Sequence, residues 1–207
     1  WPLLILAGIS ESSLSVANYI ERAKTCASQV WVEVTSLDEA RAIQAAGADA
    51  LIVKGNEASG RVSEESTFLL LQLLRGKITI PYYMQGGLGP DTATAAVIAG
   101  ASGIVLREQL WLARESPFDL EERQFWERFD GSETGTVSSK DGCYRFFSRT
   151  NRTALIDVDR ELEEGASIHE SVRSRLVSRG DDWTVFSQST EVLVPLGQEI
   201  AFACGLS

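Results

Sequence analysis

Three glycines stand where a predicted strand meets a predicted helix, at Gly86, Gly87 and Gly89. The strand covers residues 78–85, and the helix begins at Pro90, because a helix tolerates proline best at its first position. Glycines at such a junction let the backbone approach a ligand closely, and the N–H groups of the helix's first turn favour an anion. The spacing therefore predicts a phosphate-type anion here, and a tight turn with nothing bound is the alternative.

Other polar side chains follow the predicted strands at their carboxyl ends, where parallel α/β folds place the residues that contact ligands. These side chains are Glu33, Thr35, Lys54, Glu57, Arg61, Gln85, Arg107 and Glu108. One interpretation is an anion site to which Lys54, Arg61 or Arg107 adds positive charge. The other is a set of partly solvated ion pairs, such as Lys54–Glu57 or Arg107–Glu108, which contribute little to stability.

The sequence offers no pairing of a nucleophile with a base, so the catalytic residues are unknown. The single histidine, His169, lies on a predicted helix in the acidic C-terminal region, and we expect it at the surface. One remote histidine does not support Ser-His-Asp or Cys-His chemistry. Cys26, Cys143 and Cys204 are odd in number and widely spaced, so neither a metal site nor a disulfide framework is predicted.

The overall charge and hydropathy narrow the classes of partner. A formal net charge of −10 argues against a nucleic-acid or anionic-membrane partner. No apolar run reaches about 18 residues, so no transmembrane helix is expected. The absence of a signal-peptide pattern and the cysteine usage favour the cytoplasm. Since the chain starts at Trp1 in a predicted strand, we expect it to be a piece of a longer polypeptide.

The first 117 residues alternate predicted strands with predicted helices. The strands are expected at residues 2–8, 30–34, 50–53, 78–85 and 103–106, and the helices at 14–27, 36–46, 63–76 and 90–99. Residues 45–53 and 98–106 repeat one pattern of helix end, glycine, small residues and apolar strand. Such units predict an α/β fold with a parallel sheet or a (β/α)8 TIM barrel, which needs roughly 200 residues or more. We therefore expect residues 1–117 to form part of a barrel whose earlier strands are absent.

Two serines mark predicted helix starts within this region. Ser36 and Glu39 form a capping-box pattern, and Ser63 is the expected N-cap of the following helix. Residues 55–62 lie between a strand and this second helix, and we expect them to be a loop.

Residues 118–207 are more acidic and predict an appended mixed α+β connecting region. Strands are expected at 143–147 and 191–195, and helices at 168–179 and from 198, while residues 154–165 suit either a strand or the entry to a helix. Phe125, Trp126 and Phe129 are predicted to be core or docking aromatics rather than a ligand cage.

Three segments, in this order and spacing, resemble the nitronate monooxygenase (2-nitropropane dioxygenase-like) flavin barrels, a group that includes FMN-dependent enoyl reductases. They are residues 55–61 (Gly-Asn-Glu-Ala-Ser-Gly-Arg), 80–89 and 103–116. The resemblance covers about residues 30–117, the C-terminal half of such a barrel. It implies FMN, with its phosphate on the backbone N–H groups of Gly86, Gly87 and Leu88 and its ring beside Lys54 and Gly55. Gln85 and Arg107 complete the implied cofactor-binding set.

Two positions depart from the family pattern. Arg61 stands where the family carries its catalytic histidine. Arg107-Glu108 stands where the family has a Gly-Thr that also helps to bind the phosphate. A carboxylate at Glu108 is electrostatically adverse to a phosphate unless Arg107 offsets it.

The segments 106–117 and 195–198 also resemble a degenerate subgroup embedded in large polyketide or polyunsaturated-fatty-acid synthases. This implies neighbouring synthase domains and an acyl-carrier-bound substrate as partners. Two functions stay open: an FMN-dependent module that reduces or oxidises an acyl chain, and a catalytically inactive structural or docking module. A third hypothesis, ranked last, is another phosphate-binding barrel in which Lys54 forms a Schiff base.

Overall fold

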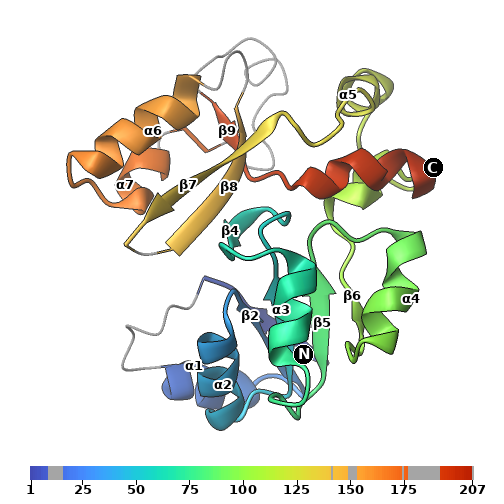
Figure 1. The fold of residues 1–207 in the computed structure, drawn as a ribbon, viewed down its shortest axis with the longest axis vertical. Helices are drawn as coiled ribbons and strands as arrows, with labels where there is room; N and C mark the ends of the chain where they lie inside the picture. Colours follow the sequence, from blue (N-terminus) through green and yellow to red (C-terminus); the bar gives the residue numbers. More distant parts are fainter. Residues whose placement is uncertain (9–15, 141, 149–152, 174, 177–191, 207) are drawn as a thin grey trace. The chain divides into compact units, whose positions relative to one another are not determined.

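A computed structural model describes residues 1–8, 16–140, 142–148, 153–173, 175–176 and 192–206 of the chain. The chain divides into two compact units, the first made of residues 1–56 and 63–106 and the second of residues 57–62 and 107–207. Each unit has its own sheet (Figure 1). Within the described ranges, no helix combines the length and the apolar character that crossing a membrane requires. The predicted domain boundary between residues 117 and 118 stays a prediction.

The first unit contains a five-stranded sheet with the strand order β1-β2-β3-β5-β6. The strands are β1 (Leu4–Leu6), β2 (Val30–Val34), β3 (Ala50–Lys54), β5 (Tyr82–Gln85) and β6 (Gly103–Ile104). The helices of this unit are α1 (Val16–Lys24), α2 (Leu37–Ala45), α3 (Thr67–Leu74) and α4 (Pro90–Ile98), coloured blue to green in Figure 1. All neighbouring strands pair in parallel, which confirms the predicted α/β fold class.

The two faces of this sheet differ, because successive side chains of a strand point to opposite sides. On one face, Val32, Leu51 and Met84 join helix residues such as Ile43 and Leu70 in one buried apolar cluster. Each fully buried side chain of this kind stabilises the fold by roughly 1.5–3 kcal/mol, so this cluster holds the helices on the sheet. The opposite face carries Ile5, Trp31, Glu33, Ile52, Lys54, Tyr83 and Gln85, as the alternation and the strand register require.

The predicted cap at Ser63 is wrong, because α3 begins later. Its N-cap is Ser66, whose hydroxyl accepts a hydrogen bond from the N–H of Leu69 at 3.3 Å. Ser63 instead accepts from the N–H of Glu65 at 3.0 Å in the preceding turn. The predicted cap at Ser36 is confirmed, since its hydroxyl accepts from the N–H of Glu39 at 3.1 Å.

The strand predicted over residues 78–85 begins only at Tyr82. Upstream of it, the side-chain oxygen of Gln44 accepts hydrogen bonds from the N–H groups of Thr79 and Ile80, at 2.7 and 3.2 Å. Pro81 has no N–H to donate. The backbone donors that would have continued the strand are therefore bound to a side chain of α2, which sequence periodicity does not reveal.

Gly55 joins the ends of two strands to the start of a helix. Its N–H donates to the carbonyl oxygen of Gln85 at 3.0 Å, and the Thr67 hydroxyl donates to the same oxygen at 3.3 Å. A Cβ atom at position 55 would lie 2.0 Å from Thr67 Oγ1 and 2.5 Å from Thr67 N. Only glycine therefore fits where β3, β5 and α3 converge.

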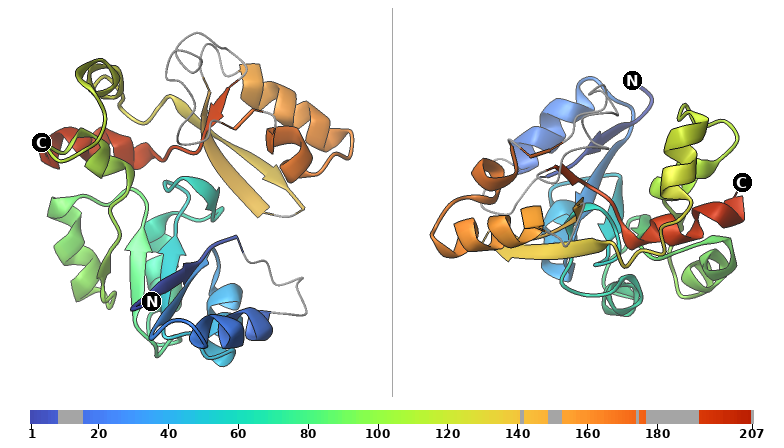
Figure 2. Two further views of the ribbon diagram at one scale, coloured as in Figure 1. Left: turned by 180° about the vertical axis from the view of Figure 1, so that it is seen from behind. Right: turned by 90° about the horizontal axis from the view of Figure 1, so that it is seen from above.

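The second unit contains an antiparallel sheet in the order β4-β8-β7, with β9 also paired to β8. Its strands are β4 (Gly60–Val62), β7 (Thr134–Ser139), β8 (Gly142–Ser148) and β9 (Leu193–Val194). Its helices are α5 (Leu120–Trp126), α6 (Thr153–Glu163), α7 (Ile168–Arg173) and the 3₁₀ helices η1 (Glu108–Leu112) and η2 (Gln198–Leu206), seen from further sides in Figure 2. Of the segment 154–165, residues up to Glu163 are thus helical. Residues 55–62, predicted as a loop, include β4.

Two apolar clusters hold the second unit together. One packs β7, β8 and β9 against α6 and α7, where Ile168 and Val172 share the buried face predicted for them. That predicted helix ends at Arg173, and residues 177–179 of the prediction lie outside the described part of the chain. The other cluster gathers Phe125, Trp126 and Phe129 around η1 and η2, so these aromatics are core residues.

We expect Asp49 to stabilise the first unit in a pH-dependent way. Its carboxylate accepts from the N–H of Val30 at 2.7 Å and from Lys24 at 3.1 Å. Burial would raise the pKa of Asp49, but these hydrogen bonds outweigh it and hold the pKa below its ordinary value. Asp49→Asn should lower the free energy of unfolding by about 1 kcal/mol at pH 7. The difference should shrink as the pH falls below about 3.9, because a lowered folded-state pKa contributes stability only while the group is ionised.

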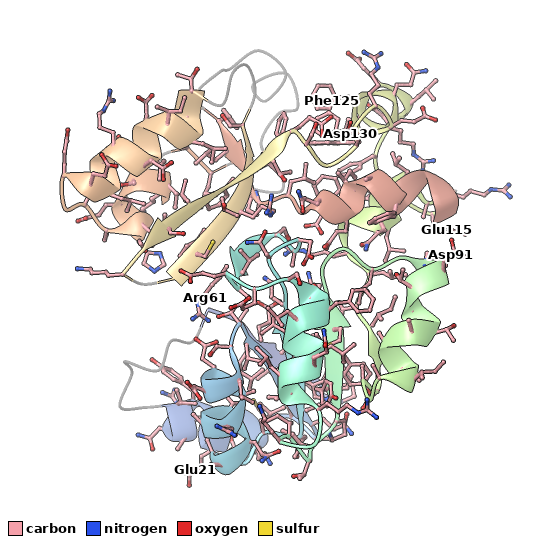
Figure 3. The ribbon with its side chains drawn as sticks, in the orientation of Figure 1. Glu21, Arg61, Asp91, Glu115, Phe125 and Asp130 are labelled. Atoms are coloured by element: carbon pink, nitrogen blue, oxygen red, sulfur yellow. The ribbon has the colours of Figure 1, made fainter. Side chains whose placement is uncertain are left out.

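Denaturant unfolding of both proteins across this pH range measures the effect. Glu21→Gln on exposed α1, labelled in Figure 3, is the control and should change stability little. An Asp49→Asn deficit that stays constant down to low pH would contradict the assignment.

Gly55→Ala should be far more destabilising than alanine at a glycine with free space. We expect a loss of about 3 kcal/mol, because the new methyl group overlaps backbone atoms of Thr67. Gly47 has a φ of +89° and no atom within 4 Å of an added Cβ, so Gly47→Ala should cost only about 1 kcal/mol. Thermal unfolding compares the two variants, and equal losses of stability in Gly55→Ala and Gly47→Ala would show that Thr67 moves aside.

Candidate functional site

Three polar residues share the carboxyl ends of β2, β3 and β5 in the first unit. Lys54 lies directly beside Gln85, and Glu33 lies opposite Ile52, one step before the strand end. The ammonium of Lys54 is 3.3 Å from Glu33 Oε2, and the two side chains are only 4% and 21% exposed. The sequence interpretation considered Glu57 for this lysine and did not identify Glu33. The strand register, which periodicity alone does not give, brings Glu33 and Lys54 together.

An aromatic pair lies on the same face, two residues nearer the amino ends of the strands. Trp31 and Tyr83 stack with their ring centroids 4.5 Å apart and their planes 14° apart. Trp31 is registered with Ala50, and Tyr83 is registered with Gly103. A Cβ at Gly103 would lie 3.1 Å from the Tyr83 ring. Small residues at these two positions leave room for the stack, which forms an apolar layer under the polar residues.

The glycine turn that follows β5 has the backbone geometry predicted for it. Gly86 has a φ of +115° and Gly87 a φ of +61°, both in the left-handed region that favours glycine. The helix α4 begins at Pro90, and Gly89 is its N-cap, with its N–H donated to Thr92 Oγ1 at 2.9 Å. A left-handed turn leading into a helix start can direct successive backbone N–H groups at an anion. The turn therefore fits a phosphate group.

Arg107 belongs to the second unit, whereas the other predicted cofactor-binding residues belong to the first. The structure thus places Lys54, Gly55, Gln85, Gly86, Gly87 and Leu88 together. Arg107 donates to the hydroxyl of Ser59 at 2.8 Å, and its Nε lies 3.6 Å from Glu108 Oε1. The ion pair that the sequence suggested between these two residues is present.

The Glu108 carboxylate is poorly compensated inside the second unit. The residue is 1% exposed, and neither of its oxygens accepts a hydrogen bond from the residues that the structure describes. Arg107 at 3.6 Å is its ion-pair partner, and the guanidinium side chain is itself half exposed. Burying a charge with so few partners is costly, so this position is strained electrostatically.

Arg61 is part of the antiparallel sheet of the second unit. It lies in β4 opposite Tyr144 of β8, and Figure 3 labels its side chain. Its Nε is 3.4 Å from the place where a Cβ on Gly142 would stand. This pairing could not be predicted from the sequence, because a strand of three residues shows too little periodicity to be recognised. The position at which the family carries its catalytic histidine is thus part of a strand in this chain rather than of a loop.

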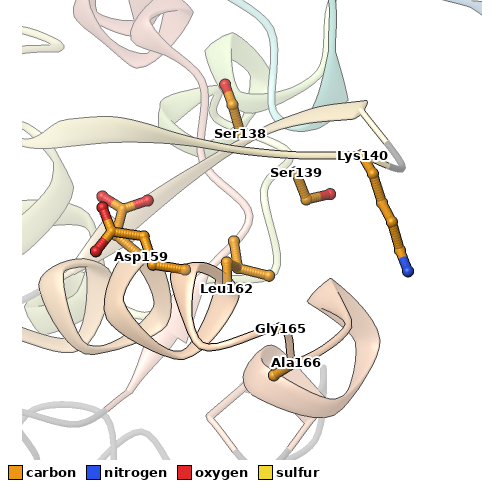
Figure 4. A pocket seen from close by; sticks show the side chains of 8 residues that line it. Ser138, Ser139, Lys140, Asp159, Leu162, Gly165 and Ala166 are labelled. Carbon is orange, nitrogen blue, oxygen red and sulfur yellow. The ribbon is translucent and has the colours of Figure 1, made fainter.

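A cavity of about 500 Å³ lies between the end of β7 and α6 in the second unit (Figure 4). Its lining includes Ser139, Lys140, Asp159 and Glu163. Burial, and then the charge of Glu163, raise the pKa of Asp159.

His169 is exposed on α7, as predicted. Among the residues that the structure describes, no group of three or more His, Cys, Asp or Glu residues could hold a metal ion.

Residues 10–174 match the family model described as nitronate monooxygenase. A curated relative from Mycobacterium tuberculosis, (3aS,4S,5R,7aS)-5-hydroxy-7a-methyl-1-oxo-octahydro-1H-indene-4-carboxyl-CoA dehydrogenase, is 29% identical over 173 residues, which are 79% of this chain and 46% of the relative. The chain therefore spans about half the length of that relative.

Two solved structures show the same fold. FabK from Thermotoga maritima has a TM-score of 0.74 at 21% identity, over 97% of this chain and 61% of that one. The enoyl reductase domain of MlnA, from the macrolactin biosynthesis cluster of Bacillus amyloliquefaciens, has a TM-score of 0.54 at 14% identity, over 90% and 52%. Likeness to such TIM-barrel proteins confirms the predicted fold class, of which this chain covers a part. Because the family model matches most of its residues, the chain belongs to the nitronate monooxygenase family.

Proposed function

We propose that the chain is part of an FMN-dependent oxidoreductase that reduces or oxidises an acyl chain. The observation that carries the proposal is the left-handed pair Gly86–Gly87 in the turn between β5 and α4, beside the polar residues Lys54 and Gln85. When bound, FMN would supply the hydride-transfer chemistry, and the protein would supply binding, orientation and electrostatics.

The chain's own residues have distinct roles in this proposal. The backbone N–H groups of Gly86, Gly87 and Leu88 bind the phosphate in this proposal, because a left-handed turn that leads into a helix start favours an anion. Lys54 and Gln85 lie next to each other on the sheet face that a barrel turns towards its interior, and they contact the ring. Gly55 holds these strand ends together and gives the site its rigidity.

The printed names of two similar proteins support a proposal for the substrate class. The curated relative is named as a dehydrogenase of a carboxyl-CoA compound, and a structural neighbour is the enoyl reductase domain of a biosynthesis cluster protein. Both names support an acyl thioester as the substrate. We propose an acyl-carrier-bound substrate and neighbouring domains of a cytoplasmic polyketide or polyunsaturated-fatty-acid synthase as the partners.

A second candidate function is a catalytically inactive structural or docking module of such a synthase. The location of Arg61 in β4 favours it, because the position of the family's catalytic histidine is part of a sheet. The buried carboxylate of Glu108 favours it too, since the family has a phosphate-binding pair at this place in the chain. The two functions differ in whether FMN binds.

The purified full-length protein should be yellow, with flavin absorbance that bleaches on reduction by a nicotinamide. Gly86→Ala should weaken FMN binding at least tenfold, about 1.4 kcal/mol, because alanine disfavours the φ of +115° that directs the turn. Gly76→Ala is the matched control, since Gly76 also has a positive φ of +72° and an added Cβ there meets no atom within 4 Å. Fluorescence titration with FMN compares the three proteins.

A colourless protein that also fails to bind added FMN would contradict the oxidoreductase and support the inactive module. Equal FMN affinity in the Gly86→Ala protein and the control would remove the glycine turn from the proposed phosphate site.

A further inference from the structure

We propose that the ion pair of Lys54 and Glu33 sets the reduction potential of the bound flavin. The Lys54 ammonium stabilises the negative charge that the ring gains on reduction, and the Glu33 carboxylate holds the ammonium in place and partly offsets its charge. This inference rests on the proposed FMN site and assigns a role within it to one pair of residues.

The strand register puts Lys54 next to the proposed phosphate site. Lys54 is the last residue of β3 and is registered with Gln85, the last residue of β5, on the same face of the sheet. The phosphate turn, Gly86 to Leu88, begins at the next residue of the chain. A cofactor whose phosphate lies on this turn has its remaining atoms over the adjacent strand ends, where the Lys54 ammonium lies.

Burial makes the charge of Lys54 effective. Its side chain is 4% exposed, and its carboxylate partner lies 3.3 Å away with 21% exposure. Charges that are shielded from water act on their neighbours more strongly, because the local dielectric constant is lower than in bulk. The other ion pair at the edge of this sheet, Lys24 with Asp49, is about 40% exposed and acts far more weakly.

Stability does not explain this pair. A buried ion pair contributes little net stability, since the desolvation of both charges offsets their attraction. On the same face, Ile52 lies opposite Glu33 and the Trp31–Tyr83 stack lies below the ion pair, so an apolar pair would also have apolar neighbours there. Charged groups that are buried next to a proposed ligand site are candidates for a functional role.

The electron balance gives the expected sign. A hydride delivered by a nicotinamide adds two electrons and one proton to the flavin, so the reduced ring carries one more negative charge. Sulfite, which adds to the oxidised ring as an anion, produces the same extra charge without a reductant. A nearby cation therefore raises the reduction potential and tightens sulfite binding. A nearby carboxylate has the opposite effect: it lowers the reduction potential and weakens sulfite binding.

The test uses the full-length protein reconstituted with FMN and two readouts, sulfite titration and the equilibrium reduction potential. Lys54→Met should weaken sulfite binding at least tenfold. A tenfold change in the equilibrium of a two-electron couple corresponds to about 30 mV, so the reduction potential should fall by at least this amount. Glu33→Gln should shift both readouts in the opposite direction, because the amide oxygen still accepts from Lys54 while the negative charge is gone. Lys54→Arg should restore most of the wild-type behaviour.

Lys24→Met is the matched control, because it removes an exposed lysine from the same unit and should leave both readouts unchanged. If FMN binds to every variant and has the same reduction potential in each, the inference is wrong and the proposed function stands. Shifts of the same sign for Lys54→Met and Glu33→Gln overturn it as well, since general loosening of the site would act in that way. If Lys54→Met does not fold, the Glu33→Gln protein decides: a raised reduction potential supports the inference, and a lowered or unchanged potential overturns it. A wild-type protein that binds no FMN overturns the proposed function and this inference with it.

Discussion

The parallel pairing of β3 with β2 and β5 is the constraint on which the first unit depends. It aligns three carboxyl ends at one edge of the sheet, and it fixes which side chains share a face. One face then holds the apolar cluster under the helices, and the other holds Glu33, Lys54 and Gln85. A shift of one residue in this register would exchange the faces and bury charges against the helices. The polar layer therefore exists only because the apolar layer on the other side is correctly packed.

Much of the first unit could be predicted from local signals. The strands at 30–34 and 50–53 are short apolar runs, and the helix after Gly89 is marked by Pro90 at its first position. The glycine turn was predicted from spacing, and its two positive φ values follow from the same chemistry. These features succeed because each depends on residues that are neighbours in the sequence.

The failures depend on residues that are distant in the sequence. The start of β5 is delayed because Gln44, far upstream, binds the N–H groups of Thr79 and Ile80. The strand β4 forms because β8, about 80 residues later, offers it an edge. The partner of Lys54 is Glu33, on a neighbouring strand. No periodicity or capping rule contains these contacts, so the ion pair at the candidate site could not be found without coordinates.

Because residues 57–62 belong to the second unit, some exchanges of gene segments between related proteins would leave a unit incomplete. The chain leaves the first unit after Asn56, contributes β4 to another sheet, and returns at Ser63. A genetic exchange that swapped everything after Leu106 would deprive β4 of its partner strand β8, and the recipient would carry an unpaired strand edge in the segment between β3 and α3. Recombination should therefore pass both units on as a linked block. Engineers who transfer one of the two units into another protein face the same constraint.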